Sequence, residues 1–355
     1  MLLSLSACDL TLKPYEAVLY DEIGSSVEEL TIFTNGSYSC IKHREYNRHA
    51  HFFGELGGDN VSFNGITADH MLQTYRYTHL QQQNDTYEFW SSAYRAIYAT
   101  NTVIERIERL PNRTSAHNQL LAENKFLRAM AHFDLVKYFG RPYAQITAGD
   151  HRNLGVPIVT TTDFNITSSL SRNTVLEVHD FIVKELLEAA ELFIQEKNSC
   201  FASKEVCYAL LSRIYLYMED NERAIEYADK VINSGRYTMF PSAQLPDYYT
   251  LVPENNPETI FAVRFTVADN LDRSSIGSMY YTAQGTNTGW AEINISFDFF
   301  DLIYTYPEDI RNGFIEIVYR PYSSSLNRYY SKKYNWQEGV VNLSSPVVLR
   351  LAEMY

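Results

Sequence analysis

Apolar residues recur at helical spacing in pairs of segments joined by short turns, and this feature restricts the fold more than any other. A first pair of helices, joined near 111–115, predicts an antiparallel hairpin. Residues 202–235 repeat the arrangement, with the length and small-residue spacing of a tetratricopeptide unit. Between the two hairpins, Thr174 and Glu177 form a capping box ahead of a further helix. Hairpins of this kind bury their apolar faces against one another, so we expect helical repeats over about 84–235.

Capping signals mark several helix ends. Ser25 and Ser26, followed three residues later by Glu28 and Glu29, form a capping-box signal ahead of apolar residues at helical spacing and predict an additional helix nearer the amino terminus. Gly140 lies where a left-handed C-terminal cap belongs, and Gly235 closes the tetratricopeptide unit.

The segments 43–83 and 238–348 lack this periodicity and are rich in glycine, polar and aromatic residues. Long irregular segments in a compact protein are functional or disordered, and the aromatic content argues against disorder. Strand-like runs such as 259–265 and a brief helix at 297–304 interrupt the second segment. The chain is therefore predicted to be mainly α, with tetratricopeptide-like helical hairpins packed against an irregular, loop-rich half that contains short strands.

The composition is that of a folded, acidic protein. Its 355 residues are 45% apolar and include only 15 Gly and 11 Pro, so the chain can bury a sizeable core. A net charge of −13 repels phosphate backbones, and we expect no nucleic-acid partner. The 28 Tyr exceed ordinary usage, and amphipathic rings suit carbohydrate and peptide binders, although most of these rings are expected in a helical core.

The first eight residues, MLLSLSAC, end in a tetrapeptide that looks like a bacterial lipobox. Small residues before the cysteine fit a signal peptidase, and the thiol carries a lipid that anchors a domain without spanning the membrane. We therefore expect 1–8 to be a lipoprotein signal remnant with lipidation at Cys8, followed by a single domain over 9–355. No Lys or Arg precedes Cys8, so the natural start is expected further upstream.

Two further features concern the rest of the chain. The final PVVLRLAEMY starts a helix without a cap or partner, which predicts that a C-terminal part is missing. The other cysteines, Cys40, Cys200 and Cys207, show no CxxC spacing, so we expect no disulfide framework. Cys207 lies in an apolar helical pattern and is expected to be buried.

The string ENKFLRAMAHFDLVKYFG, residues 123–140, resembles the most recognisable helix of the SusD/RagB family of surface lipoproteins. Other residues that match the family follow in the expected order: Trp90, Tyr94, Ile97, Asn101, Gly155, Val156, Pro157, Arg172, Thr174, Val175, the run 257–261, Asp309, Arg311, Arg350 and Glu353. His132 departs from the family, which usually has an aromatic residue there. Only Asp9 remains of the acidic run that often follows the lipidated cysteine.

This resemblance implies a glycan-binding lipoprotein of the outer membrane that faces the cell exterior. Such a protein would lie like a lid on a TonB-dependent, SusC-like transporter and deliver oligosaccharides to it. The resemblance implies no cofactor, no metal and no catalytic chemistry. Two alternatives stay open, namely the same scaffold capturing peptides or another nutrient, and a tetratricopeptide adaptor that binds only protein.

The residues themselves carry no enzyme signature, since HExxH, GxSxG, the P-loop and GxGxxG are absent. His49 and His51, near His43, lack Cys or acidic ligands at matching spacing and are expected in a solvated loop. The acid pairs within 298–309 are expected to be surface groups, not the paired carboxylates of a glycosidase. We therefore expect a binding protein that is not an enzyme.

The ligand site is predicted where the two irregular segments meet, around 59–77 and 280–290. Sugar recognition needs flat rings for the pyranose faces and amide, carboxylate or guanidinium groups for the hydroxyls. The predicted glycan-binding residues are Asp59, Asn60, Arg76, Tyr77, Tyr280, Tyr281, Asn287 and Trp290. The rings of the later segment show no helical period and are not expected in the core. Trp90, by contrast, lies on a helical face and is expected in the core.

Overall fold

The computed structural model describes residues 24–65, 70–78, 80, 84–147, 149–150, 152–283, 288–318 and 328–355. The helices are α1 (Val27–Lys42), α2 (Arg44–Leu56), α3 (His70–Tyr75), α4 (Asn84–Glu108), α5 (Ser115–Phe139), α6 (Phe164–Thr167), α7 (Val175–Leu192), α8 (Lys204–Tyr217), α9 (Asn221–Ile232), α10 (Ile276–Tyr280), α11 (Phe297–Tyr304) and α12 (Leu351–Met354). The strands are β1 (Val61–Phe63), β2 (Thr259–Ala262), β3 (Ile293–Ile295), β4 (Ile315–Val318), β5 (Arg328–Ser331), β6 (Trp336–Gln337), β7 (Val340–Val341) and β8 (Val347–Arg350). In the described part of the chain these strands form antiparallel pairs, β1 with β3, β2 with β8, β4 with β5 and β6 with β7.

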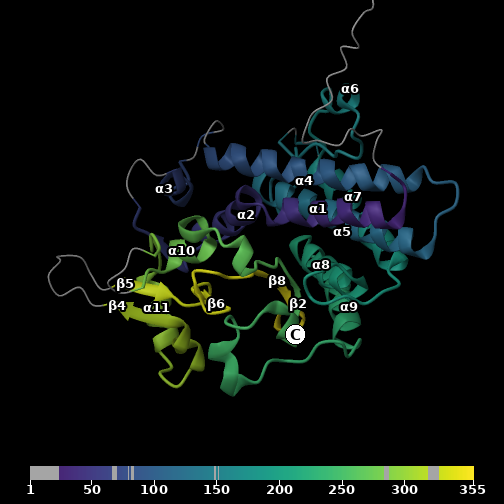
Figure 1. The fold of residues 1–355 in the computed structure, drawn as a ribbon. Coiled ribbons are helices and arrows are strands. Elements are labelled where there is room, and N and C mark those ends of the chain that lie inside the picture. Colours follow the sequence, from purple (N-terminus) through teal and green to yellow (C-terminus); the bar gives the residue numbers. More distant parts are fainter. Residues whose placement is uncertain are drawn as a thin grey trace, which may run out of the picture.

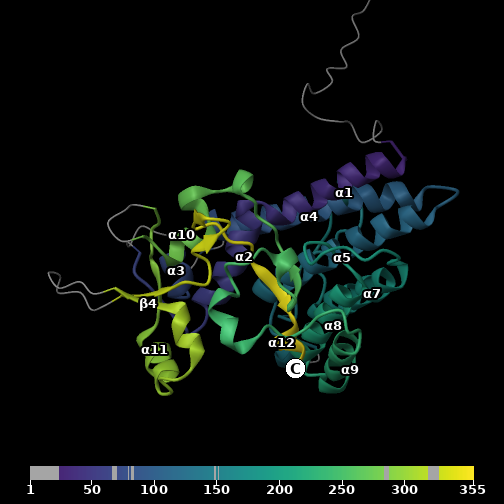
Figure 2. The same cartoon turned by 60° about the horizontal axis from the view of Figure 1, so that its bottom comes forward.

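The helices and strands separate into two halves (Figures 1 and 2). In the helical half, α4, α5, α7, α8 and α9 pack as successive neighbours, and α1 lies against α4 and α5. The other half holds α10, α11 and most of the short strands (Figure 1). The expected mainly α fold, with hairpins against an irregular half, is confirmed.

The helix ends show which capping predictions were right. Both capping boxes form, because Ser26 Oγ accepts from the Glu29 amide and Thr174 Oγ1 from the Glu177 amide. Gly235 follows α9 with φ of +66°, the left-handed conformation that glycine tolerates best.

Gly140 ends α5, but its left-handed cap was wrongly predicted. Its φ is −101°, an extended conformation open to any residue. A Cβ at this position would lie 2.7 Å from the Val136 carbonyl oxygen. Close packing, not backbone conformation, therefore explains this glycine.

The core of the helical half contains the residues that the helical period placed there. Leu135 is fully buried, and Leu210 and Cys207 are buried beside it in one cluster. The cluster extends over α4, α5, α7, α8 and α9 and reaches β2 and β8. Burial of this apolar surface is the main force that holds the hairpins together.

A buried ionic network joins α4, α5 and α7 within this core. Glu185 accepts a hydrogen bond from Lys125 Nζ at 2.8 Å and another from Arg128 Nε at 2.8 Å. Arg128 also donates to Asn101 Oδ1 at 2.8 Å. Each buried charge thus has a partner, which a low-dielectric interior requires.

His132, the departure from the family pattern, is a fully buried neutral imidazole. Its Nε2 accepts from the Val159 amide at 3.2 Å, so Nδ1 carries the proton and donates to the Arg128 carbonyl at 2.8 Å. Burial lowers its pKa to about 3. The ring therefore satisfies two backbone groups, which an aromatic hydrocarbon could not do.

The expectation of an irregular segment over 43–83 was wrong for its first third. Residues 44–56 form helix α2, whose buried face carries Tyr46, His49, Phe52 and Leu56. The helical period was hidden because one buried position is a histidine and not an apolar residue. His49 consequently lies on a helix, 4% exposed, and not in a solvated loop.

Two further findings concern the membrane and the cysteines. Among the helices that the structure describes, none is long and apolar enough to cross a bilayer. Cys40, Cys200 and Cys207 are free thiols. Cys8, with its predicted lipidation, lies outside the described residues.

Candidate ligand-binding site

The irregular segments 43–83 and 238–348 meet in space through β1 and β3. β1 pairs with β3 in antiparallel register, with Val61 opposite Ile295 and Phe63 opposite Ile293. Beyond the ladder, the Ser296 amide donates to the Asn60 carbonyl at 3.0 Å and the Ser296 hydroxyl to the Asp59 carbonyl at 2.6 Å. This pairing brings the regions around residues 60 and 295 to one wall of a cleft.

The cleft has a volume of about 400 Å³. Its walls come from α2, β1, β3, α10, α11, β4, β5, β8 and the loops beside them. The lining residues are Glu55, Asn60, Val61, Leu245, Tyr249, Tyr280, Ile295, Phe299, Ile303, Arg311, Phe314, Ile315, Ser331, Lys333, Tyr334 and Arg350. This volume and mixed lining fit a small-molecule site of the usual size.

Aromatic rings form a continuous group in the cleft. The centroid of Tyr334 lies 4.9 Å from that of Tyr280 and 6.3 Å from that of Tyr249. Burial raises the pKa of Tyr280 and of Tyr334 well above the ordinary value, so both phenols stay protonated. Such rings offer an apolar face together with a hydroxyl for hydrogen bonding.

The charged groups of the cleft differ in how far they are already paired. Arg350 Nε donates to Glu258 at 2.8 Å, and Arg311 Nε to Asp309 at 3.0 Å. Lys333 Nζ lies 5.7 Å from the centroid of the Tyr249 ring. It makes no ion pair with a carboxylate of the described residues. Its ammonium group therefore keeps its donors for a ligand.

Glu55 and His51 on α2 complete the polar side of this region. Burial raises the pKa of Glu55, and the nearby Lys333 opposes that shift. His51 Nε2 shares a hydrogen bond of 2.8 Å with the Tyr280 hydroxyl. Burial, with a contribution from Lys333, lowers the pKa of His51 to about 3, so the ring is neutral at physiological pH.

The structure divides the predicted binding residues between the cleft and its surroundings. Asn60 and Tyr280 line the cleft. Tyr280 is only 2% exposed and packs in a second apolar cluster with Phe52, so the expectation that its ring is outside the core was wrong. The absence of a helical period around Tyr280 was misleading, because the five-residue helix α10 is too short to show one.

Five other predicted residues lie in the described part of the chain but do not line the cleft. Asp59, Arg76 and Tyr77 are exposed, and the Tyr77 hydroxyl donates to the Gly57 carbonyl. Tyr281 is half-buried with its ring 6.1 Å from that of Tyr330. Asn287 lies outside the described residues.

Trp290 presents a half-exposed ring in a tightly held loop. The residue is 48% exposed, and its Nε1 donates to the Arg273 carbonyl at 2.9 Å. The Arg273 guanidinium covers one face of the ring, with Cζ 3.6 Å from the ring centroid. The preceding Gly289 allows no side chain, because a Cβ there would lie 1.9 Å from the Tyr281 carbonyl oxygen. The hydrogen bond and the guanidinium contact therefore hold the ring against Arg273.

Tyr249, Lys333 and Tyr334 were missed by the sequence analysis. They lie in irregular segments with no motif, and they meet only because β4 pairs with β5 and the chain returns toward residue 249. Arg311 was noted for its family match and not as a binding residue. No local signal distinguishes these residues from the other surface tyrosines and lysines of the chain.

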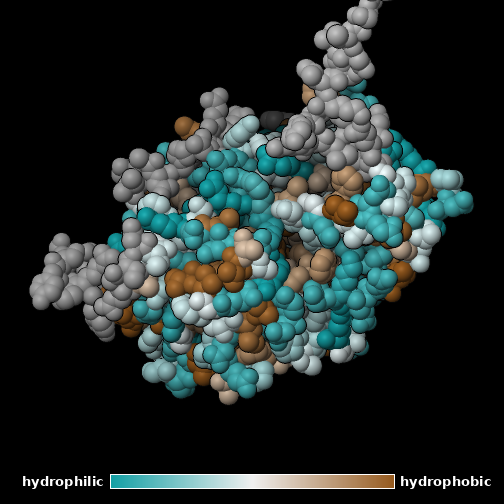
Figure 3. All heavy atoms as spheres, in the orientation of Figure 1, coloured by the Kyte–Doolittle hydropathy of each residue, from teal (hydrophilic) through white to brown (hydrophobic). Residues whose placement is uncertain are grey.

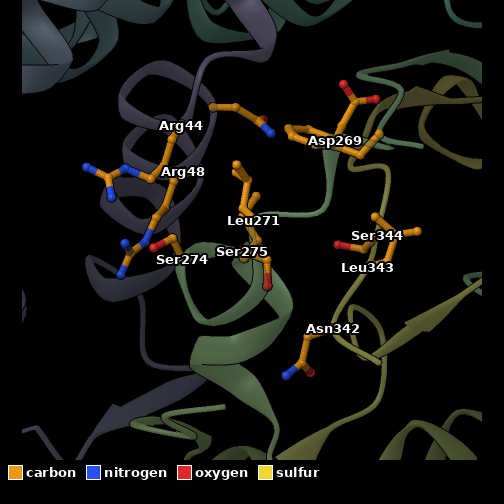
Figure 4. Close-up of a pocket in the computed structure, with 12 residues that line it drawn as sticks. Arg44, Arg48, Asp269, Leu271, Ser274, Ser275, Asn342, Leu343 and Ser344 are labelled. Carbon is orange, nitrogen blue, oxygen red and sulfur yellow. The ribbon is translucent and has the colours of Figure 1, made fainter. Parts of the chain in front are cut away.

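Other hollows are less suited to a ligand. The pocket between α2 and residues 269–276 and 342–344 has a volume of about 20 Å³, room for about one water molecule (Figure 4). A groove of about 290 Å³ beside α1 is larger, but Lys42 is paired with Asp269 and Arg264 with Glu254. The surface seen in Figure 3 is mostly hydrophilic, with hydrophobic residues gathered over the region of α10.

Comparison with known families gives a match over more than half of the chain. Residues 10–216 match the model of a SusD-like family described as starch-binding and associating with the outer membrane. Two curated relatives come from Formosa agariphila: SusD-like protein P38 is 22% identical over 290 residues, and SusD-like protein P2 is 24% identical over 273. The alignments cover 76% and 75% of this chain but only 53% and 51% of the relatives. The chain thus spans about half the length of the curated relatives it matches.

Solved structures share the fold. A SusD superfamily protein of Bacteroides thetaiotaomicron superposes with a TM-score of 0.83 at 23% identity, over 93% of this chain and 74% of that protein. A laminarin-binding SusD-like protein superposes with a TM-score of 0.73 at 20% identity, over 92% of this chain and 78% of that protein. At this level of identity the agreement establishes the architecture of helical hairpins and irregular half.

Proposed function

Because this chain belongs to the SusD-like family, described as starch-binding and associating with the outer membrane, we propose that it captures oligosaccharides at the cell surface. The bound glycan passes to a TonB-dependent, SusC-like transporter in the outer membrane. The protein is held there by the lipid on Cys8 and faces the exterior. It binds its ligand without chemical change.

The cleft is the observation that carries the proposal. It places three tyrosine rings, an amide side chain and a lysine that has no ion pair among the described residues within about 400 Å³. Sugars have apolar ring faces surrounded by hydroxyls, so they match walls that alternate aromatic surface with hydrogen-bonding groups.

The predicted residues enter the proposal in two ways. Asn60 supplies hydrogen-bonding groups inside the cleft, and Tyr280 supports its wall. Trp290 offers a second surface for stacking, since one face is covered by Arg273 and nearly half of the side chain is exposed. Asp59, Arg76, Tyr77, Tyr281 and Asn287 remain proposed contacts around these two surfaces.

A glycan array probed with the purified chain tests the proposal. The array should include starch-type and laminarin-type oligosaccharides, because relatives are described as binding these classes. We expect binding to one structural class and an affinity at least tenfold weaker in Lys333→Met, a loss of about 1.4 kcal/mol. Methionine keeps most of the apolar stem and removes the ammonium group with its charge and its three donors.

Lys332→Met is the matched control, since the adjacent lysine does not line the cleft. Equal losses in the two variants would indicate a general charge effect and contradict a site in the cleft. Absence of any glycan ligand, with binding of peptides instead, would support the alternative in which the scaffold captures another nutrient.

A further inference from the structure

Three potential metal ligands meet where α2 packs against the start of α4. His49 Nε2 lies 3.5 Å from Asp85 Oδ1 and 3.7 Å from Glu88 Oε2. One ligand atom from each residue can be chosen so that all three lie within 4.8 Å of one another. Asp85 and Glu88 are three residues apart on α4 and therefore project from the same side of the helix.

The His49 ring is oriented as in a metal ligand. Its Nδ1 lies 2.8 Å from the Glu45 carbonyl oxygen, which can only accept, so Nδ1 carries a proton. In the neutral ring the lone pair is then on Nε2, directed at the two carboxylates. A hydrogen bond from the second ring nitrogen to a carbonyl is the arrangement that usually fixes metal-binding histidines.

Burying the His49 ring and the Asp85 carboxylate costs free energy unless their polar atoms have partners. The His49 side chain is 5% exposed, and its Nε2 makes no hydrogen bond of ordinary length with the described residues. Asp85 Oδ2 is also buried without a hydrogen-bond partner among them. Buried polar atoms are normally satisfied, so His49 Nε2 and Asp85 Oδ2 have lone pairs available for a ligand.

We propose that His49, Asp85 and Glu88 bind a divalent transition-metal ion, with Zn²⁺ as the reference ion. Ligand atoms about 2.0–2.1 Å from a tetrahedral Zn²⁺ lie about 3.4 Å apart, close to the two distances measured from His49. Two carboxylates and a neutral imidazole balance the charge of the ion. One imidazole and two carboxylates suit Zn²⁺ better than Ca²⁺, which takes six to eight oxygen ligands.

The consequence for the protein is structural. The ion would join α2 to α4, and the same α2 carries Glu55 at the wall of the cleft. Metal binding would therefore stabilise the fold, because the ligands are brought together only in the folded chain. This inference does not depend on the identity of the glycan or on glycan binding.

The competing explanation is a protonated His49 that forms an ion pair with the two acids and needs no metal. Metal binding by the full chain distinguishes the two. The chain is stripped with EDTA, dialysed, and titrated with ZnCl₂ by calorimetry, with bound zinc counted by elemental analysis. We expect one Zn²⁺ per chain, a higher melting temperature with Zn²⁺, and no comparable effect of CaCl₂.

Variants locate the site. His49→Gln and Glu88→Gln should each weaken Zn²⁺ binding at least tenfold and remove the rise in melting temperature. Glu88 is 37% exposed, so its variant should fold even if the buried His49 variant does not. His43→Gln and Glu108→Gln, on the same two helical regions but outside the cluster, are the controls.

The outcomes are separable. Tight binding lost only in the two cluster variants supports the site. Binding of less than one Zn²⁺ per two chains, or binding that survives in both variants, would overturn it and favour the ion pair.

Discussion

Two histidines with lowered pKa values, the partly buried His51 and the fully buried His132, make the stability of this protein sensitive to mild acid. Burial lowers the pKa of each ring to about 3, against about 6.5 in an unfolded chain. The unfolded chain therefore binds more protons between these values, and stability is lost as the pH falls from about 6.5 toward 3. Each group contributes up to about 1.4 kcal/mol for each pH unit in that range.

Urea unfolding between pH 7.5 and pH 5 measures this effect. We expect a smaller pH slope in His132→Gln, which lacks the titrating group but keeps a donor and an acceptor. His43→Gln serves as the control, because this ring is 45% exposed. Identical slopes in the wild type and His132→Gln would show that the buried ring is not responsible.

Trp290 is the side chain whose removal should separate binding from stability. Trp290→Ala should weaken glycan affinity at least tenfold, about 1.4 kcal/mol, because a stacking ring is lost. The folded state should lose only about 1 kcal/mol, since the contact with Arg273 is partly exposed. Calorimetric titration and thermal unfolding of the same sample give both values.

Trp336→Ala is the comparison, because Trp336 has nearly the same exposure, 47%, and no predicted role. An unchanged affinity in Trp290→Ala, or a large fall in its stability, would assign Trp290 to the structure alone.

The helical hairpins are predicted to support the site without contacting the ligand. Leu135→Ala on α5 or Leu210→Ala on α8 should reduce the free energy of unfolding by about 2–5 kcal/mol, the usual effect of a core cavity. Leu216→Ala, on the same α8 but 58% exposed, should change it by less than about 0.5 kcal/mol. Affinity for glycan should be unchanged in all three folded variants, and a selective loss of binding would place the ligand on the repeats.

The hairpins were predictable from sequence because their stabilising contacts follow the helical period. Thr174 and Glu177, for example, form the capping box that their spacing indicates. α2 was missed because its buried face includes His49, whose partners Asp85 and Glu88 come from another helix. A polar residue that is buried by tertiary contacts has no signature in its own segment.

The candidate site was predictable only in part, for a similar reason. Glycine-rich and aromatic composition indicated the two segments that β1 and β3 join. It could not identify Lys333 or Tyr334, because a residue lines the cleft only when distant strands pair in one register. A shift of one residue in a strand would turn its side chains to the opposite face.

The proposed membrane anchor would fix the position of the whole molecule, and substitution of Cys8 tests this proposal. Expression in a lipoprotein-processing bacterium with labelled palmitate should give a labelled protein in the membrane fraction. Cys8→Ala should abolish the label, whereas Cys40→Ala should not, since only Cys8 is the cysteine of the lipobox-like tetrapeptide. Equal labelling of the wild type and Cys8→Ala would contradict lipidation at this position.

The pairing of β1 with β3 also sets an order of events during synthesis. The hairpins α4–α5 and α8–α9 are made of neighbouring segments, so each can close without waiting for the rest of the chain. Val61, however, is translated long before its partner Ile295, and β2 likewise precedes β8. Closing such long loops is slow, and the apolar faces near Phe52 and Val61 stay uncovered meanwhile. We therefore expect the chain to acquire its helical scaffold early and its cleft last, and to be most prone to aggregation in the interval before β3 and β8 have paired.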